Sequence, residues 1–152
     1  MWRWRPSKLI YGLLSLAWAL SITNFSTDRF SAARTSLFFG PLLRWLLPTA
    51  DEQTIYLIHI AIRKLAHLSE YALLAMLLFG MWSAAEIHWR YRWFAYTLVL
   101  VLGQALFDEY LQSLSRQRIG SLTDTLIDLT GAALALLVIW LVRRKYFSTL
   151  SR

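Results

Sequence analysis

The chain has 152 residues, of which 57% are hydrophobic and 16% are charged, so it is one domain by length and too apolar for an ordinary soluble domain. The absence of Cys excludes disulfide frameworks, thiolate metal sites and cysteine nucleophiles. The net charge of +7 comes from basic residues at the ends of apolar stretches, a pattern typical of contact with lipid headgroups that argues against a nucleic-acid partner.

Four apolar stretches predict membrane-spanning helices. They cover residues 9–23, 68–85, 93–111 and 125–142. The first is shorter than the roughly 20 residues that a hydrocarbon core of about 30 Å requires, but Trp2 and Trp4 can extend it into the interface. The sequence therefore predicts an all-α integral membrane protein built as a four-transmembrane-helix bundle.

A cleaved signal peptide is the alternative interpretation of the first stretch. The stretch follows a basic segment, and the small residues Ala19 and Ser21 have a spacing typical of a cleavage site. We favour an uncleaved anchor, because this helix completes the bundle and its charge balance.

The connection between the first and second stretches contains a second apolar segment. This segment covers residues 37–47, includes Gly40 and Pro41, and is followed by Pro48. It is too short to cross a bilayer, so we expect it to lie in or dip into the outer interface.

A helix is predicted to begin shortly after this segment. Thr49 and Glu52 have the spacing of a capping box, and neither Gly nor Pro interrupts residues 50–79. The helix is expected either to continue unbroken into the second span or to bend near Arg63 and Lys64.

The distribution of Lys and Arg predicts the orientation of the bundle. With the N-terminus inside, the inner ends carry nine of the 16 basic residues and only one of the nine acidic residues. The positive-inside rule then places both termini in the cytoplasm.

Six polar or charged residues lie in or at the ends of the last three apolar stretches: His67, Glu70, Asp108, Glu109, Asp124 and Asp128. Such groups are costly in hydrocarbon, so they usually face a bundle interior and mark a working site. At about 1.5 Å of rise per residue, five of them lie roughly 18–24 Å from Trp residues that mark the inner interface. We therefore expect one polar layer in the outer third of the bilayer.

Helical spacing gives each of these stretches one polar edge. The residues that share a face are Lys64 with His67 and Tyr71, Asp108 with Gln112, and Asp124 with Asp128. Glu70 lies beside the first face, and Gly131 follows the last and permits close helix approach. The edges are expected to turn toward one another or toward a wet cavity.

This constellation predicts a site with two kinds of residue. Under the catalytic interpretation His67 is the general base, and Asp108 and Glu109 orient it or hold a cation. The predicted ligand-binding residues are Lys64, Glu70, Tyr71, Gln112, Arg118, Asp124 and Asp128, with Arg118 holding an anionic group. No spacing matches a specific metal motif, and no nucleophile elbow or phosphate-binding Gly loop is present, so we assign neither a metal nor a cofactor.

The same residues also have structural explanations. Asp124 can complete a capping box begun by Ser121, Lys64 can reach lipid phosphates, and His67 can be a hydrogen-bonded structural histidine. These explanations are weakest for the carboxylates that need a partner or a proton at that depth: Glu70, Asp108 and Asp128.

Two ordered blocks of sequence carry a resemblance to a known family. The blocks are Arg63-Lys64-Leu65-Ala66-His67-Leu68-Ser69-Glu70-Tyr71-Ala72 and Asp108-Glu109-Tyr110-Leu111-Gln112, and they are followed by Arg118, Gly120, Asp124, Asp128 and Gly131. This order is similar to the VanZ-like family of small polytopic membrane proteins, over a motif core of residues 63–142. Where the family often has Pro-Gly, this chain has Arg116 and Gln117, which predicts a different outer turn.

The resemblance implies a single VanZ-like domain over residues 1–152 in a bacterial inner membrane. The founding member is associated with resistance to the glycopeptide antibiotic teicoplanin, which implies a role in such resistance or in envelope maintenance. We expect an outward-facing polar pocket that binds or acts on an envelope amphiphile, such as a lipid-linked precursor, a phospholipid headgroup or a lipoglycopeptide. Whether the protein is an enzyme stays open, and the alternative is a non-enzymatic structural or shielding partner in an envelope complex.

Overall fold

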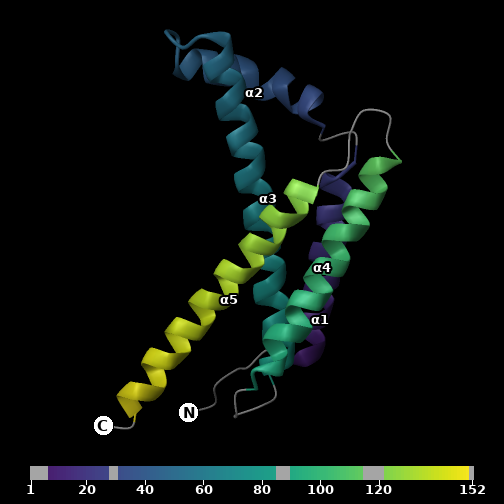
Figure 1. The fold of residues 1–152 in the computed structure, drawn as a ribbon, viewed down its shortest axis with the longest axis vertical. Coiled ribbons are helices and arrows are strands. Elements are labelled where there is room, and N and C mark those ends of the chain that lie inside the picture. The colour runs from purple at the N-terminus through teal and green to yellow at the C-terminus, as the bar shows by residue number, and fades with distance from the viewer. Residues whose placement is uncertain (1–6, 28–30, 85–89, 115–121, 151–152) are drawn as a thin grey trace.

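The computed structural model describes residues 7–27, 31–84, 90–114 and 122–150. Within these ranges the chain forms five helices and no strand (Figure 1). The helices are α1 (Lys8–Phe25), α2 (Ala32–Leu46), α3 (Glu52–Ser83), α4 (Arg92–Ser113) and α5 (Leu122–Leu150). The prediction of an all-α chain is confirmed.

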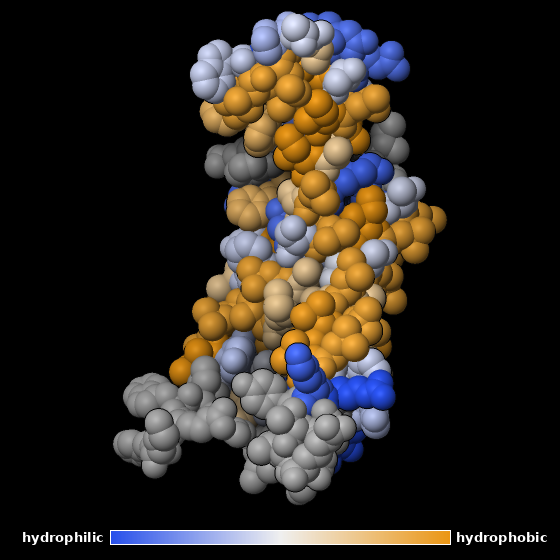
Figure 2. Space-filling model, turned by 90° about the vertical axis from the view of Figure 1, so that its left-hand side faces the viewer, coloured by the Kyte–Doolittle hydropathy of each residue, from blue (hydrophilic) through white to orange (hydrophobic). Residues whose placement is uncertain are grey.

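Four of the helices, α1, α3, α4 and α5, are long and apolar enough to cross a membrane, which confirms the predicted membrane bundle. The central helix is α3, since each of the other four packs on it, and α5 makes the most extensive contact. Figure 2 shows apolar side chains covering most of one face, with charged residues gathered mainly toward its two ends.

The start of α3 differs from the predicted capping box. Asp51 is the N-cap, and its side chain accepts a hydrogen bond from the backbone N–H of Thr54 at 2.8 Å. The prediction that Thr49 and Glu52 cap this helix was therefore wrong, because the carboxylate of Asp51 accepts the free backbone N–H of Thr54 instead. From Glu52 the helix continues unbroken for 32 residues, so the bend considered near Arg63 does not occur.

The second apolar segment forms part of α2, a helix of 15 residues that includes Pro41. Its length of about 22 Å is too short to span a membrane. In Figure 1 α2 lies across the end of the bundle where α3 begins. In this position α2 packs on α3.

The core depends on close contact between α3 and α5. A Cβ at Gly131 would overlap the carbonyl oxygen of Leu68 and lie 2.9 Å from its carbonyl carbon. The expectation that Gly131 permits close approach is confirmed. The contact brings α5 against the backbone of Leu68, the residue that follows His67. Large side chains such as Tyr71, Leu74 and Phe79 complete the buried interior.

Candidate functional site

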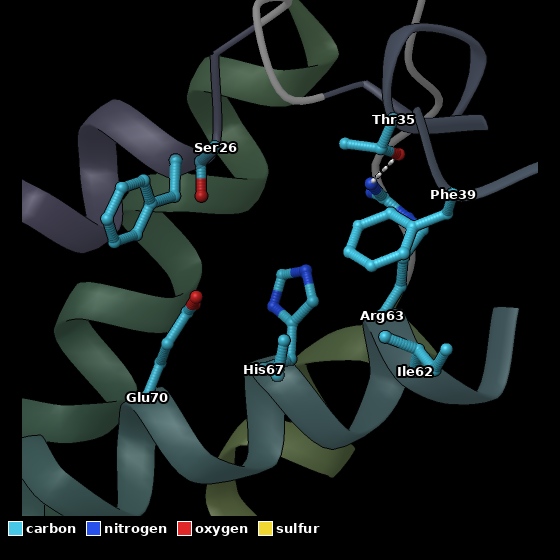
Figure 3. A pocket seen from close by; sticks show the side chains of 9 residues that line it. Ser26, Thr35, Phe39, Ile62, Arg63, His67 and Glu70 are labelled. Carbon is cyan, nitrogen blue, oxygen red and sulfur yellow. Dashed lines mark hydrogen bonds between the residues drawn. The ribbon is translucent and has the colours of Figure 1, made fainter. Parts of the chain in front are cut away.

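A cavity of about 270 Å³ lies between the end of α1, α2 and the middle of α3. One part of its wall is apolar and is formed by Phe25, Phe39, Ile62 and Ala66. The other part is polar and is formed by Ser26, Thr35, Arg63, His67 and Glu70 (Figure 3). We call this cavity the α2 pocket.

The charged wall of the α2 pocket comes from one face of α3. Arg63, His67 and Glu70 follow each other at intervals of four and three residues, which places them on the same side of a helix. Lys64, which the sequence analysis grouped with His67, is exposed and does not line the pocket. The cation in the wall is therefore Arg63, which begins the first motif block but was not predicted as a site residue.

His67 is paired with Asp128 across the interface between α3 and α5. The imidazole Nδ1 and the carboxylate Oδ1 lie 3.3 Å apart, and the side chains are 19% and 4% exposed. Both atoms are shielded from solvent and have no aligned hydrogen-bond partner among the described residues. The contact has the length of a salt bridge and is an ion pair when the imidazole is protonated. The other ring nitrogen points into the α2 pocket (Figure 3).

Glu70 extends its carboxylate into the pocket beside His67 (Figure 3). Its backbone carbonyl accepts a hydrogen bond from the indole Nε1 of Trp18 at 2.9 Å, which ties α1 to α3 at this level. Within the described part of the chain, its carboxylate has no hydrogen bond or ion pair. Arg63 lies within electrostatic reach of both Glu70 and Asp124.

Thr35 lies between Arg63 of the α2 pocket and His59 of α3. The guanidinium Nη1 of Arg63 donates a hydrogen bond to the hydroxyl of Thr35 at 3.3 Å, as the dashed line in Figure 3 shows. The same hydroxyl lies 3.1 Å from Nε2 of His59, whose ring packs on Phe39. These contacts attach α2 to α3 and hold its aromatic side chain against the cavity.

Asp108 lies outside the pocket, in a network that joins α1, α3 and α4. Its carboxylate accepts hydrogen bonds from the hydroxyl of Tyr71 at 2.6 Å, from Thr23 at 3.0 Å and from Gln104 at 3.3 Å. The residue is only 3% exposed. With three donors in place, Asp108 and Tyr71 are suited to holding the helices in register.

The remaining predicted residues do not line the α2 pocket or lie outside the described part of the chain. On α4, Glu109 is half-buried and Gln112 is buried, and neither lines the α2 pocket. Asp124 is half-buried on α5. Arg118, and Ser121 as the considered cap of α5, lie outside the described residues. Among the residues that are described, no group of three His, Asp or Glu side chains is placed to hold a metal ion.

Several residues of the site were missed by the sequence analysis. Gln104 precedes Asp108 by four residues, and this polar pair on one helical face is a usable signal. Thr23 and Thr35 lie in short polar stretches, beside Asn24 and Ser36, and no periodic pattern distinguishes them from their neighbours. Their contributions depend on how α1 and α2 pack on α3.

Comparison with known proteins identifies the family. The family model described as VanZ/LLP1 matches residues 4–143, a range that contains both motif blocks and the α2 pocket. No curated protein and no solved structure matches the chain. Since the match covers nearly the whole chain, the protein belongs to the VanZ/LLP1 family.

Proposed function

We propose that this protein binds an amphiphilic lipid of the bacterial cell envelope in the α2 pocket. The observation that carries the proposal is the mixed wall of this cavity, which combines charged side chains of α3 with the apolar side chains of Phe25, Phe39, Ile62 and Ala66. The headgroup would contact Arg63, His67 and Glu70, and the start of an acyl or prenyl chain would pack on Phe25 and Phe39.

An amphiphile fits this wall better than a wholly polar or a wholly apolar ligand. An unpaired polar group in a buried site costs about 1–3 kcal/mol, so an apolar ligand would leave the carboxylate of Glu70 without compensation. A small polar solute would leave the side chains of Phe25 and Phe39 exposed to water. A lipid headgroup with its first methylene groups satisfies both sides at once.

The charge distribution supports an outward-facing pocket. Arg143, Arg144 and Lys145 lie near the end of α5, far from α2 (Figure 1). Arg143 and Arg144 lie over the rings of Phe79 and Trp140 at 5.5 and 5.3 Å, an arrangement common at membrane interfaces. The positive-inside rule assigns this end to the cytoplasm, with both termini, and the α2 pocket to the outer side of an inner membrane.

Matched substitutions at two adjacent cations test the proposal. The protein is purified in mild detergent, and the lipids that it retains are identified by mass spectrometry. Arg63→Gln removes the cation in the pocket wall, so retention of the bound lipid class should fall by about tenfold, the usual effect of losing a charged hydrogen bond. Lys64→Gln removes an exposed cation and should leave retention unchanged.

Two results would contradict lipid binding in the α2 pocket. One is equal loss of lipid in both variants, which would indicate a nonspecific surface effect. The other is retention by Arg63→Gln at the wild-type level while both variants accumulate normally.

A catalytic form of the same function has one specific observation in its favour, the pairing of His67 with Asp128. A carboxylate beside Nδ1 fixes the orientation of the imidazole and leaves Nε2 to accept a proton from a ligand in the pocket. His67→Gln should then preserve accumulation and lipid retention but abolish any change in the lipid headgroup between membranes with and without the protein. If the lipid composition is identical with and without wild-type protein, binding alone is the function.

A role in glycopeptide resistance would follow if the retained amphiphile is a lipid-linked wall precursor or a lipoglycopeptide tail. Teicoplanin susceptibility of cells that express wild-type protein or Arg63→Gln tests this link. Protection by the wild type alone supports it. Equal susceptibility of both strains leads instead to a role in envelope maintenance or as a structural partner.

A further inference from the structure

We propose that Glu70 recognises a primary amine, so that the preferred ligand of the α2 pocket is an aminophospholipid. This inference rests on the proposed lipid-binding function and names the headgroup. In this arrangement the ammonium group lies against Glu70 and the phosphodiester lies toward Arg63.

The first argument is the state of the Glu70 carboxylate. It projects into the cavity (Figure 3), and no described side chain makes a hydrogen bond or ion pair with it. By contrast, the buried carboxylate of Asp108 has three hydrogen-bond donors, and that of Asp128 has His67. A carboxylate at membrane depth needs a cation or a donor, and the open side of Glu70 is the pocket itself.

The second argument is the order of charges along α3. Arg63 and Glu70 are seven residues apart on one face, a rise of about 10.5 Å, with His67 between them. The wall thus has a fixed cation at one end and a carboxylate at the other. A zwitterionic headgroup can pair with both ends, whereas a headgroup that is only anionic pairs with Arg63 and is repelled by Glu70.

The surrounding charges strengthen this preference. Asp124 acts on Arg63 from α5, and Asp128 lies behind His67 from the same helix. An anionic ligand without an amine therefore has carboxylates of α3 and α5 near it that repel it, although Arg63 attracts it. An ammonium group beside Glu70 offsets that repulsion.

The chemistry of the acceptor selects a primary amine over a quaternary one. A carboxylate accepts hydrogen bonds, and an ammonium group donates three. A trimethylammonium group has no donor and is bound mainly by aromatic faces. Phosphatidylethanolamine should consequently bind better than phosphatidylcholine, although both headgroups are zwitterionic.

The test uses the full chain in nanodiscs that contain equal amounts of dioleoyl phosphatidylethanolamine, phosphatidylglycerol and phosphatidylcholine. Native mass spectrometry after release counts the lipids that each protein molecule retains. The wild type should retain phosphatidylethanolamine at least about tenfold over the other two lipids, the size expected for a charge-assisted hydrogen bond. Glu70→Gln should abolish this preference, and Lys64→Gln should keep it.

The outcomes separate this inference from the proposed function. Retention of all three lipids equally by the wild type, with loss in Arg63→Gln, supports lipid binding but overturns amine recognition. Equal retention of phosphatidylethanolamine and phosphatidylcholine in excess of phosphatidylglycerol overturns the primary-amine requirement. Retention of none of them, or retention independent of Arg63, overturns the proposed function. A melting temperature of Glu70→Gln close to the wild-type value shows that its loss of preference is not unfolding.

Discussion

Replacing Gly131 by Ala tests whether the contact between α3 and α5 sets the geometry of the His67–Asp128 pair. An added Cβ would overlap the carbonyl oxygen of Leu68 and lie 2.9 and 3.0 Å from its carbonyl carbon and Cα. All three are backbone atoms, so no side chain can rotate away. The two helices must separate instead.

The size of the effect follows from ordinary contact distances. Carbon atoms pack at about 3.5–4.0 Å, so α5 has to move away from α3 by on the order of 1 Å. Such a shift takes the His67–Asp128 contact, now 3.3 Å, beyond ion-pair distance. Overpacking of this kind costs about 1–3 kcal/mol, which for a chain of this size corresponds to roughly 2–12 °C in melting temperature.

The assay is thermal unfolding of the purified protein in detergent, together with lipid retention. Gly103→Ala is the matched control, since no heavy atom lies within 4 Å of a Cβ at that position. It should be neutral, or stabilising by up to about 1 kcal/mol through helix propensity. If Gly131→Ala melts at the wild-type temperature and retains lipid normally, the inferred helix contact does not control the site.

Three further substitutions test the network at Asp108 and the N-terminal cap of α3. Tyr71→Phe removes one of the three donors to Asp108 and should lower the free energy of unfolding by about 1–3 kcal/mol, measured by thermal melting; an unchanged melting temperature would refute the structural role of this network. Asp51→Ala should lower the melting temperature because Asp51 caps α3, whereas Thr49→Ala should not; equal effects would contradict the cap. Hydrogen bonds from the side chain and then the backbone of Thr54 hold the pKa of Asp51 below its usual value. The difference in melting temperature between Asp51→Ala and wild type should therefore be present at neutral pH and disappear as the pH falls through that pKa.

The sequence was sufficient to predict the four long helices and the level at which His67 and Asp128 meet. Hydropathy identifies the four long helices, since each must bury its backbone polar groups internally to cross a bilayer. Depth counting placed His67 and Asp128 in one layer, and the structure brings them to 3.3 Å. The role of Gly131 was also predictable, because a small residue on a membrane-spanning helix lets a neighbouring helix approach closely.

The exact rotation of α3 was beyond sequence reasoning. With 3.6 residues per turn, both Arg63 and Lys64 are reasonable neighbours of His67, and the packing of α5 decides between them. The hydroxyl of Thr23 and the α2 residues Thr35 and Phe39 enter the site through contacts between separate helices, which leave no periodic trace in the chain. Thr35 and Phe39 help to convert the polar edge of α3 into a pocket, and Thr23 supports the network at Asp108.

The central claim, that an envelope lipid occupies the α2 pocket, is tested most directly by photocrosslinking. A phospholipid that carries a photoreactive group next to its headgroup is incorporated into membranes containing the protein, and the labelled residues are mapped by peptide mass spectrometry. Lipid binding in the α2 pocket predicts labels concentrated on residues 62–70 of α3 and near Phe39, with strong reduction in Arg63→Gln. Labels spread evenly over lipid-exposed positions such as Leu137 and Val138 of α5, unchanged by that substitution, would contradict it.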